Sequence, residues 1–327
     1  MKRLLPVLSY SIALTLIFVA APSMRAQQEG SLPTQILVSV DQKSTPPASA
    51  SQLIVSVDNR KEPLSAWSPV LPAGAQVALL IDDGLRDSVG RELGNLHKFI
   101  QGLPPGVEIM VGYMQNGRVL QLQPFTADHG LAASALRLPE GMPGASASPY
   151  FCLSDFVKNW PEAGTRDPNA AATIGGDYAS SATHKARFVL MITNGVDPYN
   201  GSTSPMNQDS PYVSTAVTDS QRAGVAVYSI YYNDAGIRGG GASFSGQSYL
   251  GQLSQATGGV NYYEGSGNPV SMAPFLDEFQ RAIAGTYIAT FEAPAGKNAK
   301  DLVRVKLTAA TKTKLRAPEE VRPGNAE

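Results

Sequence analysis

Cysteine and histidine are scarce in this 327-residue chain, which has one cysteine, Cys152, and three histidines. A single cysteine excludes an internal disulfide, and its apolar neighbours in PYFCLSDFV predict a small core residue rather than a nucleophile. His97, His129 and His184 fall on separate expected elements without metal-ligand spacing, so we expect each on the surface or on a helix face. Neither residue type offers a candidate catalytic group.

The chain also lacks an excess of positive charge. Its 26 Lys and Arg against 27 Asp and Glu give a formal net charge of −1. Removal of residues 1–26 would take away Lys2, Arg3 and Arg25 and leave 23 against 27, or −4. A mildly acidic chain of this kind lacks the excess of basic residues that binds nucleic acid or anionic lipid, and we expect neither as a partner.

Three common catalytic signatures are missing as well. No GxGxxG follows the first strand expected in the middle of the chain, no GxxxxGK occurs, and the serine-rich stretch GASFSGQSYLG does not match GxSxG. Their absence disfavours nucleotide binding and nucleophilic hydrolase chemistry. We expect that the protein is not an enzyme.

The N-terminal residues have the pattern of a secretory signal peptide. Lys2 and Arg3 precede an apolar run over about residues 4–21, and the small residues of AAPSMRAQ predict cleavage near Ala26. The run is close to the lower length limit of a spanning helix, so a retained membrane anchor is the alternative. We favour cleavage of residues 1–26, which predicts an exported chain, periplasmic or extracellular, without stable membrane insertion.

The middle of the chain alternates expected strands and helices. VALLID, at 77–82, is a continuous apolar run, as in a strand buried on both faces. Asn116-Gly117 between VEIMVGYM and RVLQLQ is a strong hairpin signal. This order predicts an α/β fold with a doubly wound, mostly parallel, Rossmann-like sheet that contains one hairpin. Further strands are expected at 187–193, 226–232 and 259–264, and helices at 87–101, 127–138, 150–160, 211–223, 247–256 and 270–284.

Strand-like segments flank this middle part. QILVSVD at 35–41 and QLIVSVD at 52–58 alternate apolar and small polar residues on either side of a Pro/Ser/Ala linker. TYIATFEA, DLVRVKLTA and TKLRA near the other end read as strands too. Because lone hairpins are marginal in water, we expect residues 35–58 and 286–317 to share one small β unit. The expected division is signal peptide 1–26, N-terminal β flank and linker 27–70, central domain 71–285 and C-terminal β flank 286–327.

Ligands of a doubly wound sheet bind beyond the carboxyl ends of its strands. We expect residues 82–87, 141–149 and 194–210 to crowd that rim and residues 233–247 to extend it. Residues 194–210 and 233–247 are rich in Gly, Ser, Asn and Tyr, a composition that resembles adaptable binding surfaces. Several of the tyrosines, Tyr231 and Tyr232 among them, have a core position as the alternative.

Five segments together resemble a von Willebrand factor type A domain, in particular the exported type A-related proteins of acidobacteria. They are VALLIDDGLR, PGASASPYFCLSDFV, RFVLMITNGVDP, RAGVAVYSIYY and ATGGVNYYE. The similarity spans roughly residues 71–291, and strand-rich flanks are also typical of that family. Each segment alone is weak, and their combination is specific.

The resemblance implies a metal-ion-dependent adhesion site at the rim, with DxSxS in its first loop, a Thr in its second and an Asp in its third. Such hard oxygen donors suit Mg²⁺. Asp82 matches the first Asp, but Gly84 and Arg86 stand at the two serine positions and Asn194 replaces the third-loop Asp. Ser146 or Ser148 lies where the Thr would be. The motif is therefore degraded, and we expect no cofactor; a retained Mg²⁺ would be held by Asp82, Ser148 and Asn194.

Two more acidic residues lie beside the motif, Asp83 and Asp197. We expect the Arg86 guanidinium to pair with Asp82 or Asp83 in place of the missing metal, because a carboxylate without its cation must be hydrated, protonated or paired. Arg86 directed to solvent or to a partner is the alternative. The candidate ligand-binding residues are Asp82, Asp83, Arg86, Ser146, Ser148, Asn194, Asp197 and Tyr199.

Three functions follow from these observations. The first is an exported binding module that engages a protein or a surface polymer through the rim without chemistry. The second is a metal-assisted hydrolase that uses Asp82, Asp83 and Asp197. The third is a structural partner in an envelope assembly that docks through its β flanks. The identity of the protein or envelope partner is not encoded in any motif.

Overall fold

A computed structural model describes residues 30–41, 43–47, 49–141, 148–161, 185–197, 211–233, 239–265, 267–295, 301–310 and 312–326. Its centre is a six-stranded sheet in the order β10-β9-β8-β5-β6-β7. Neighbouring strands are parallel except for β6 and β7. The prediction of a doubly wound, mostly parallel α/β sheet is confirmed. The strands are β5 (Ala75–Asp82), β6 (Glu108–Gln115), β7 (Arg118–Thr126), β8 (Ala186–Thr193), β9 (Val225–Tyr231) and β10 (Asn261–Tyr262).

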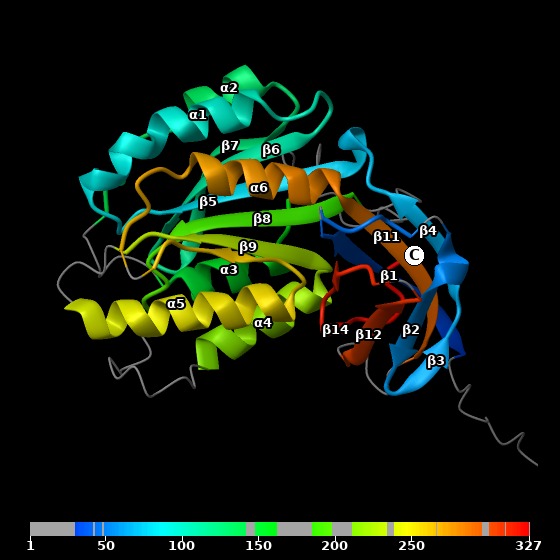
Figure 1. Ribbon diagram of the computed structural model, residues 1–327. Helices are drawn as coiled ribbons and strands as arrows, with labels where there is room; N and C mark the ends of the chain where they lie inside the picture. The colour runs from blue at the N-terminus through cyan, green and yellow to red at the C-terminus, as the bar shows by residue number, and fades with distance from the viewer. Residues whose placement is uncertain are drawn as a thin grey trace, which may run out of the picture.

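Helices cover both faces of this sheet (Figure 1). Helices α1 (Leu93–Gln101), α2 (His129–Ser134) and α6 (Ala273–Ala284) pack on one face, and α3 (Pro149–Lys158), α4 (Pro211–Arg222) and α5 (Gly239–Ala256) pack on the other. A 3₁₀ helix, η3 (Asp87–Glu92), precedes α1. The helix expected over 87–101 therefore consists of a 3₁₀ helix followed by an α-helix.

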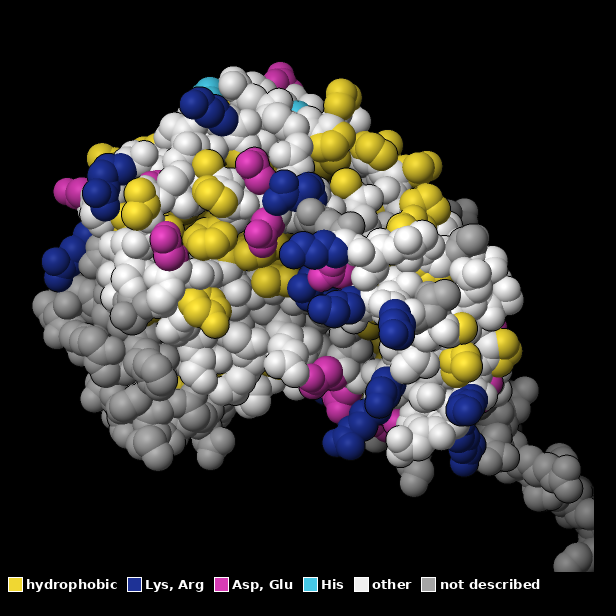
Figure 2. Space-filling model, viewed as in Figure 1, with side chains coloured by type: hydrophobic (Ala, Val, Ile, Leu, Met, Phe, Trp, Pro, Cys, Tyr) yellow, Lys and Arg dark blue, Asp and Glu magenta, His cyan; other side chains and the backbone are white. Residues whose placement is uncertain are grey.

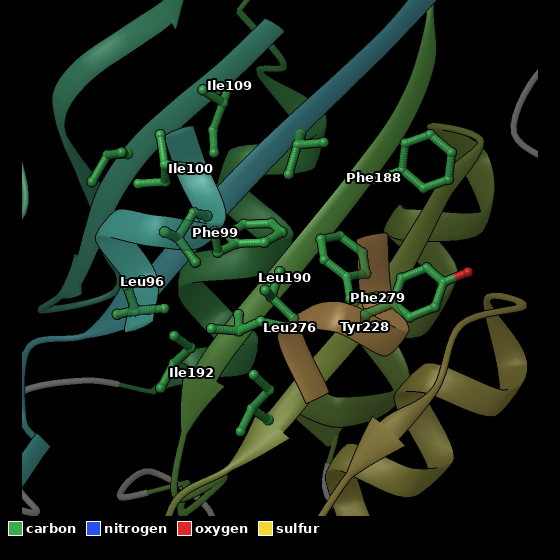
Figure 3. Packing of buried hydrophobic residues seen from close by; sticks show 14 of the residues in the cluster. Leu96, Phe99, Ile100, Ile109, Phe188, Leu190, Ile192, Tyr228, Leu276 and Phe279 are labelled. Atoms are coloured by element: carbon green, nitrogen blue, oxygen red, sulfur yellow. The ribbon is translucent and has the colours of Figure 1, made fainter. Parts of the chain in front are cut away.

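Strand β5 is buried at all eight of its residues, as its continuous apolar run predicts. Alternate residues face opposite layers, so Leu79 and Ile81 join one core cluster and Ala78 and Leu80 the other. Figure 3 shows the first cluster, where side chains of α1 and α6 meet those of β6, β8 and β9.

The predicted hairpin joins β6 to β7. Asn116 and Gly117 have φ values of +50° and +78°, as the type I′ turn requires, and Gln115 pairs with Arg118. A second turn of this kind, Asp58-Asn59, joins β2 (Leu53–Val57) to β3 (Arg60–Glu62) with φ values of +46° and +67°. The alternating pattern of QLIVSVD extends through residue 58, so it does not predict this turn.

The two ends of the chain form one β unit, as predicted. β1 pairs with β11, and β2 pairs with β12. Two four-stranded sheets, β13-β1-β11-β4 and β14-β12-β2-β3, enclose a common apolar cluster that includes Val38, Val55, Phe291 and Val305. We call this unit the β sandwich. Its elements are β1 (Ser31–Val40), η1 (Ala50–Gln52), β2 (Leu53–Val57), β3 (Arg60–Glu62), β4 (Leu64–Pro69), β11 (Thr286–Pro294), β12 (Val303–Ala309), β13 (Leu315–Arg316) and β14 (Glu320–Val321).

The β sandwich contacts the amino ends of the central strands. Leu37 of β1 packs against the first core cluster, and Glu319 N donates to the Ala256 carbonyl at the end of α5. Between β4 and β5 lies the short 3₁₀ helix η2 (Pro72–Gly74). On the side of the molecule that Figure 2 shows, Lys and Arg side chains gather where the β sandwich meets the central sheet and its helices.

Three strands are not predicted from the sequence: β3 and β4, which lie within residues 60–69, and β14. The expectation for residues 233–247 is wrong. Helix α5 begins at Gly239, so most of residues 233–247 belongs to a helix and not to a rim loop.

Among the described residues, no helix combines the length and apolar character needed to cross a bilayer.

Candidate functional site

The candidate site lies where the strand order of the sheet reverses. β6 and β7 lie on one side of β5, and β8, β9 and β10 lie on the other. Doubly wound folds bind ligands at this switch point, outside the carboxyl ends of the strands. β5 ends at Asp82 and β8 at Thr193, and the register that pairs Ile81 with Ile192 brings these ends together. We call the loops after these strand ends the rim.

The Asp82 carboxylate holds two of the rim loops. Its Oδ1 accepts a hydrogen bond from the Gly84 N–H at 2.8 Å, and its Oδ2 accepts one from the Thr193 hydroxyl at 2.6 Å. Asp82 is 3% exposed. A buried carboxylate is costly unless donors surround it, and these two donors meet that requirement within the protein.

The loop after β8 is held from three sides. The Gly195 N–H donates to Thr193 Oγ1 at 3.0 Å, and the Tyr150 hydroxyl donates to the Gly195 carbonyl at 2.8 Å. Gly195 has a φ of +66°, which favours glycine. On the third side is Gly246 of α5, where a Cβ would lie 2.2 Å from the Asn194 carbonyl oxygen. Loop and helix therefore touch through their backbones.

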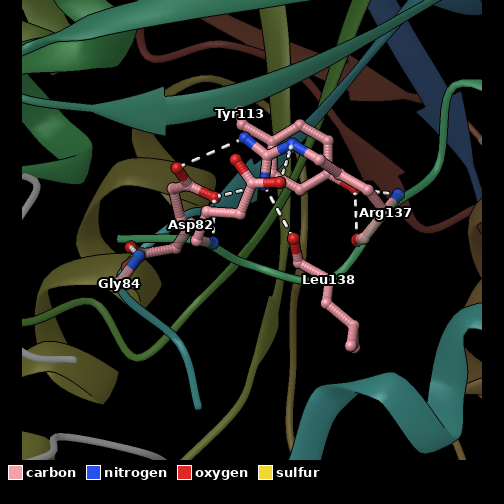
Figure 4. Close-up of polar contacts among 7 residues, drawn as sticks. Asp82, Gly84, Tyr113, Arg137 and Leu138 are labelled. Carbon is pink, nitrogen blue, oxygen red and sulfur yellow. Dashed lines mark hydrogen bonds and ion pairs between the residues drawn. The ribbon is translucent and has the colours of Figure 1, made fainter. Parts of the chain in front are cut away.

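Asp83 makes a separate set of contacts with Arg137, which lies beside Tyr113 (Figure 4). Its carboxylate accepts from two nitrogens of Arg137, at 2.8 and 3.3 Å, and from the Glu140 N–H at 3.0 Å. The Arg137 guanidinium lies over the Tyr113 ring, 4.0 Å from its centroid. The Tyr113 hydroxyl accepts from Arg137 N and donates to Arg137 O, so side chain and backbone of Arg137 are both held. Asp83 is fully buried, and this network compensates its charge.

The cation that the structure describes beside Asp83 is not the expected Arg86. The guanidinium that reaches Asp83 belongs to Arg137, whereas Arg86 is exposed and immediately precedes η3. The physical reason is position: the segment after α2 returns along the rim beside Asp83, and the Gly141 N–H donates to the Asp83 carbonyl.

The other predicted rim residues are buried where the structure describes them. Ser148 caps α3, with its Oγ accepting from the Phe151 N–H at 3.3 Å. The Asn194 side-chain oxygen accepts from the Val196 N–H at 2.8 Å, and Asp197 is 3% exposed. Ser146 and Tyr199 lie outside the described residues.

Burial also shows whether the tyrosines expected near the rim are core residues or surface residues. Tyr231, Tyr232 and Tyr249 are each at most 2% exposed, so they are core residues rather than binding-surface residues. Tyr150, which the sequence analysis did not single out, packs edge to face with Tyr249. Burial raises the pKa of Tyr150 well above its usual value, and the nearby charges of Asp197 and Asp82 raise it further. The Tyr150 hydroxyl is therefore a fixed donor.

Cys152 is a buried core residue, as predicted. Burial, assisted by the charge of Asp82, raises the pKa of its thiol to about 12. A thiol that stays protonated at neutral pH is a poor nucleophile.

The residues that the resemblance assigns to a metal are Asp82, Ser148 and Asn194. They supply one carboxylate, and each of the side-chain oxygens already accepts a hydrogen bond from the protein. Mg²⁺ prefers near-octahedral oxygen ligands with one or two carboxylates. In the described part of the chain, no three His, Cys, Asp or Glu side chains are grouped closely enough to hold a metal ion. These residues therefore offer Mg²⁺ a single carboxylate, both oxygens of which already accept hydrogen bonds.

Four residues that organise the rim were missed by the sequence analysis: Thr193, Tyr113, Arg137 and Tyr150. The sequence does contain a signal for Thr193 as a rim residue, because Thr193 ends a buried strand immediately before Asn194-Gly195. It contains no such signal for Arg137, which follows a short helix and lies 54 residues from its partner Asp83.

No family model matches this chain, and no curated protein matches it. Similar solved structures include an aerotolerance-related membrane protein from Bacteroides fragilis, with 10% identity, a TM-score of 0.42, and coverage of 64% of this chain and 98% of that one. A von Willebrand factor type A protein from Catenulispora acidiphila has 10% identity, a TM-score of 0.41, and coverage of 90% and 75%. The ArnB paralogue VWA2 from Sulfolobus acidocaldarius has 10% identity, a TM-score of 0.37, and coverage of 89% and 75%. Type A domains are thus among the structures to which this chain is similar, at a distant level.

Proposed function

We propose that this chain is an exported binding module that engages a protein, or a surface polymer, through the rim without chemistry. The observation that carries the proposal is that the acidic side chains of the rim bind other groups of the protein and so fix its loops. Asp82 ties the loop after β5 to the end of β8, and Asp83 ties it to Arg137. Loops held on a rigid sheet in this way are suited to present exposed residues such as Arg86 to a partner.

Export is part of the proposal. Its support is the basic start, the apolar run over about residues 4–21 and the small residues before Gln27, all of which lie outside the described residues. The proposed location is periplasmic or extracellular.

The proposal also holds that the rim is a degraded adhesion site. Gly84, Arg86 and Asn194 replace two hydroxyls and one carboxylate of the motif that the sequence resembles. The Asn194 side-chain oxygen and both Asp82 oxygens accept hydrogen bonds from the protein. We therefore propose recognition by protein groups at the rim rather than by a bound ion.

The hydrolase alternative has less support. It requires Asp82, Asp83 and Asp197 to converge on one metal or one water. Asp83 is instead bound by Arg137 and the Glu140 N–H, while Asp82 is bound by Gly84 and Thr193. The two neighbouring carboxylates thus have separate sets of donors.

Affinity capture from the native envelope tests the proposal, with the chain from residue 27 on as bait because it keeps every described residue. Arg86→Glu reverses a charge at the rim. Arg60→Glu reverses an exposed charge on β3 of the β sandwich and is the matched control. We expect the native bait and Arg60→Glu to retain the same partner and Arg86→Glu to lose most of it.

Two outcomes would contradict rim binding. If native bait and Arg86→Glu retain the same partner equally, the contact does not involve this part of the rim. If Arg60→Glu alone loses the partner, the chain docks through its β flanks, as the structural-partner alternative requires. Circular dichroism of each bait confirms that both variants are folded.

A further inference from the structure

A second concave site lies at the opposite end of the central sheet from the rim. A cavity of about 550 Å³ opens where the amino ends of β8 and β9 meet the β sandwich. Its walls come from the ends of α3 and α4, from β1 and from the segment after β14. Ligand pockets typically have volumes of roughly 300–1,000 Å³, so a small molecule could occupy this one.

The walls of this cavity are strongly cationic. Five basic side chains line it: Lys158, Lys185, Arg187, Arg222 and Arg322. The described residues place one carboxylate in the lining, that of Asp219. In a chain with a formal net charge of −1, this concentration of positive charge is local and not a result of composition.

The carboxylates near this cavity are already engaged. Asp219 accepts a hydrogen bond from Ser154 at 2.6 Å and contacts Lys158 and Arg222 at 3.6 and 3.5 Å. Glu108, outside the lining, pairs with Lys185 at 2.5 Å. Among the described residues, two carboxylates thus face five cations, and this local excess of positive charge attracts an anion.

Helix ends explain part of this arrangement. Lys158 and Arg222 are the last residues of α3 and α4, where a cation is favoured by the helix dipole. Lys185, Arg187 and Arg322 are not in helices, so this reason does not apply to them. Arg187 lies on β8 and is oriented by Trp160, whose ring centroid is 5.4 Å from its guanidinium carbon.

The segment after β14, which lines the cavity with Arg322, Gly324 and Asn325, is fixed by hydrogen bonds to β1. Gln35 N donates to the Asn325 side-chain oxygen at 2.7 Å, and the Asn325 amide donates to the Gln35 carbonyl at 2.9 Å. The Gly324 N–H donates to Thr34 Oγ1 at 3.1 Å. These bonds attach the segment to β1 and so position Arg322 at the cavity.

We propose that this cavity binds a small oxyanion with more than one negative charge, a polycarboxylate or a phosphate compound. Planar guanidinium groups bind the two oxygens of a carboxylate or phosphate group in a bidentate manner, and the neighbouring lysines add charge. This proposal is independent of binding at the rim, because the two sites lie at opposite ends of the sheet.

Titration calorimetry of the chain from residue 27 on, at low ionic strength, tests the proposal with two probes, citrate and inorganic pyrophosphate. The variants are Arg322→Gln, at an exposed cavity residue, and Lys158→Gln, with Arg60→Gln on β3 as the matched control. We expect saturable binding of at least one probe and a loss of roughly tenfold in affinity in each cavity variant, since each loses a charge-assisted hydrogen bond. Arg60→Gln should bind like the native chain, and added NaCl should weaken binding.

The two probes separate the sources of the oxyanion. Binding of citrate alone assigns a carboxylate ligand, and binding of pyrophosphate alone assigns a phosphate ligand. No saturable binding of either probe up to about 10 mM, which corresponds to about −2.7 kcal/mol, would overturn the proposal. An equal loss in Arg60→Gln would overturn it as well, because the binding would then follow net charge and not the cavity.

Discussion

Asp83 and Arg137, 54 residues apart in sequence, form a two-point ion pair at the rim. The carboxylate is fully buried, and the guanidinium side chain is 20% exposed and lies over the Tyr113 ring. A cation from the protein's own chain thus stands beside an acidic residue of the first rim loop. This pair gives the rim a charge balance that does not depend on a bound ion.

Loss of Arg137 should therefore destabilise the protein. Arg137→Met keeps the length of the side chain but leaves the buried Asp83 charge without its cation, which should lower the free energy of unfolding by about 3 kcal/mol. Urea denaturation measures the change. Arg118→Met, at an exposed position on β7, is the control and should change it by less than about 0.5 kcal/mol. Equal effects of the two substitutions would show that the pair contributes little.

Two glycines of α5 should respond in opposite directions to the same substitution. At Gly246 a Cβ would lie 2.2 Å from the Asn194 carbonyl oxygen, whereas at Gly251 nothing lies within 4 Å. Gly246→Ala should cost about 2 kcal/mol or more, because backbone must move. Gly251→Ala should gain up to about 1 kcal/mol from helix propensity. Thermal denaturation distinguishes them, and a tolerated Gly246→Ala would mean that the rim loop is not held against α5.

The metal prediction follows from the degraded motif. Calorimetry with Mg²⁺ and Mn²⁺ should show no saturable site on the native chain at millimolar metal. The triple change Gly84→Ser, Arg86→Ser, Asn194→Asp restores two hydroxyls and one carboxylate and should create one. Saturable metal binding by the native chain would contradict the degraded site and favour the adhesion-site mechanism.

The Cys152 thiol should be unreactive in the folded protein. Its pKa is raised from 9.0 to about 12 by burial, so the folded thiol stays protonated where the unfolded thiol ionises. Its contribution to stability is complete below pH 9 and is lost as pH rises from about 9 to about 12, by up to about 1.4 kcal/mol per pH unit. A thiol-reactive dye at pH 8 should label the chain only after unfolding, and Cys152→Ala should show a shallower loss of stability above pH 9. Rapid labelling of the native chain would contradict the buried position.

Some parts of the fold could be predicted because their causes are local. The apolar run of 77–82 predicts a buried strand, and Asn116-Gly117 predicts a tight hairpin, since only a few residues tolerate a positive φ. β14 has two residues, too few for a pattern to show. The start of α5 was missed for another reason: Gly239, Gly240 and Gly241 are poor helix formers, and the local signal there favours a loop.

The candidate site could be predicted in place but not in its contacts. Asp82 ends one buried strand and Asn194 follows another. The carboxyl ends of parallel strands meet at one edge of a sheet, so the proximity of these two residues follows from the fold class. The identity of the cation that pairs with Asp83 does not follow from the fold class. Arg86 is close in sequence but exposed, while Arg137 comes from the segment after α2 on another part of the chain.

The amino-acid pattern is sufficient to predict the class of fold, the pairing of the two flanks into one β unit and the position of the rim. Each of these follows from the period of apolar residues and from turn chemistry, which act over a few residues. The tertiary structure alone decided which donors hold Asp82 and Asp83 and which basic side chains line the cavity beside the β sandwich. Those contacts join residues that are remote in sequence, and only the packing of helices and strands against one another sets the distances between them.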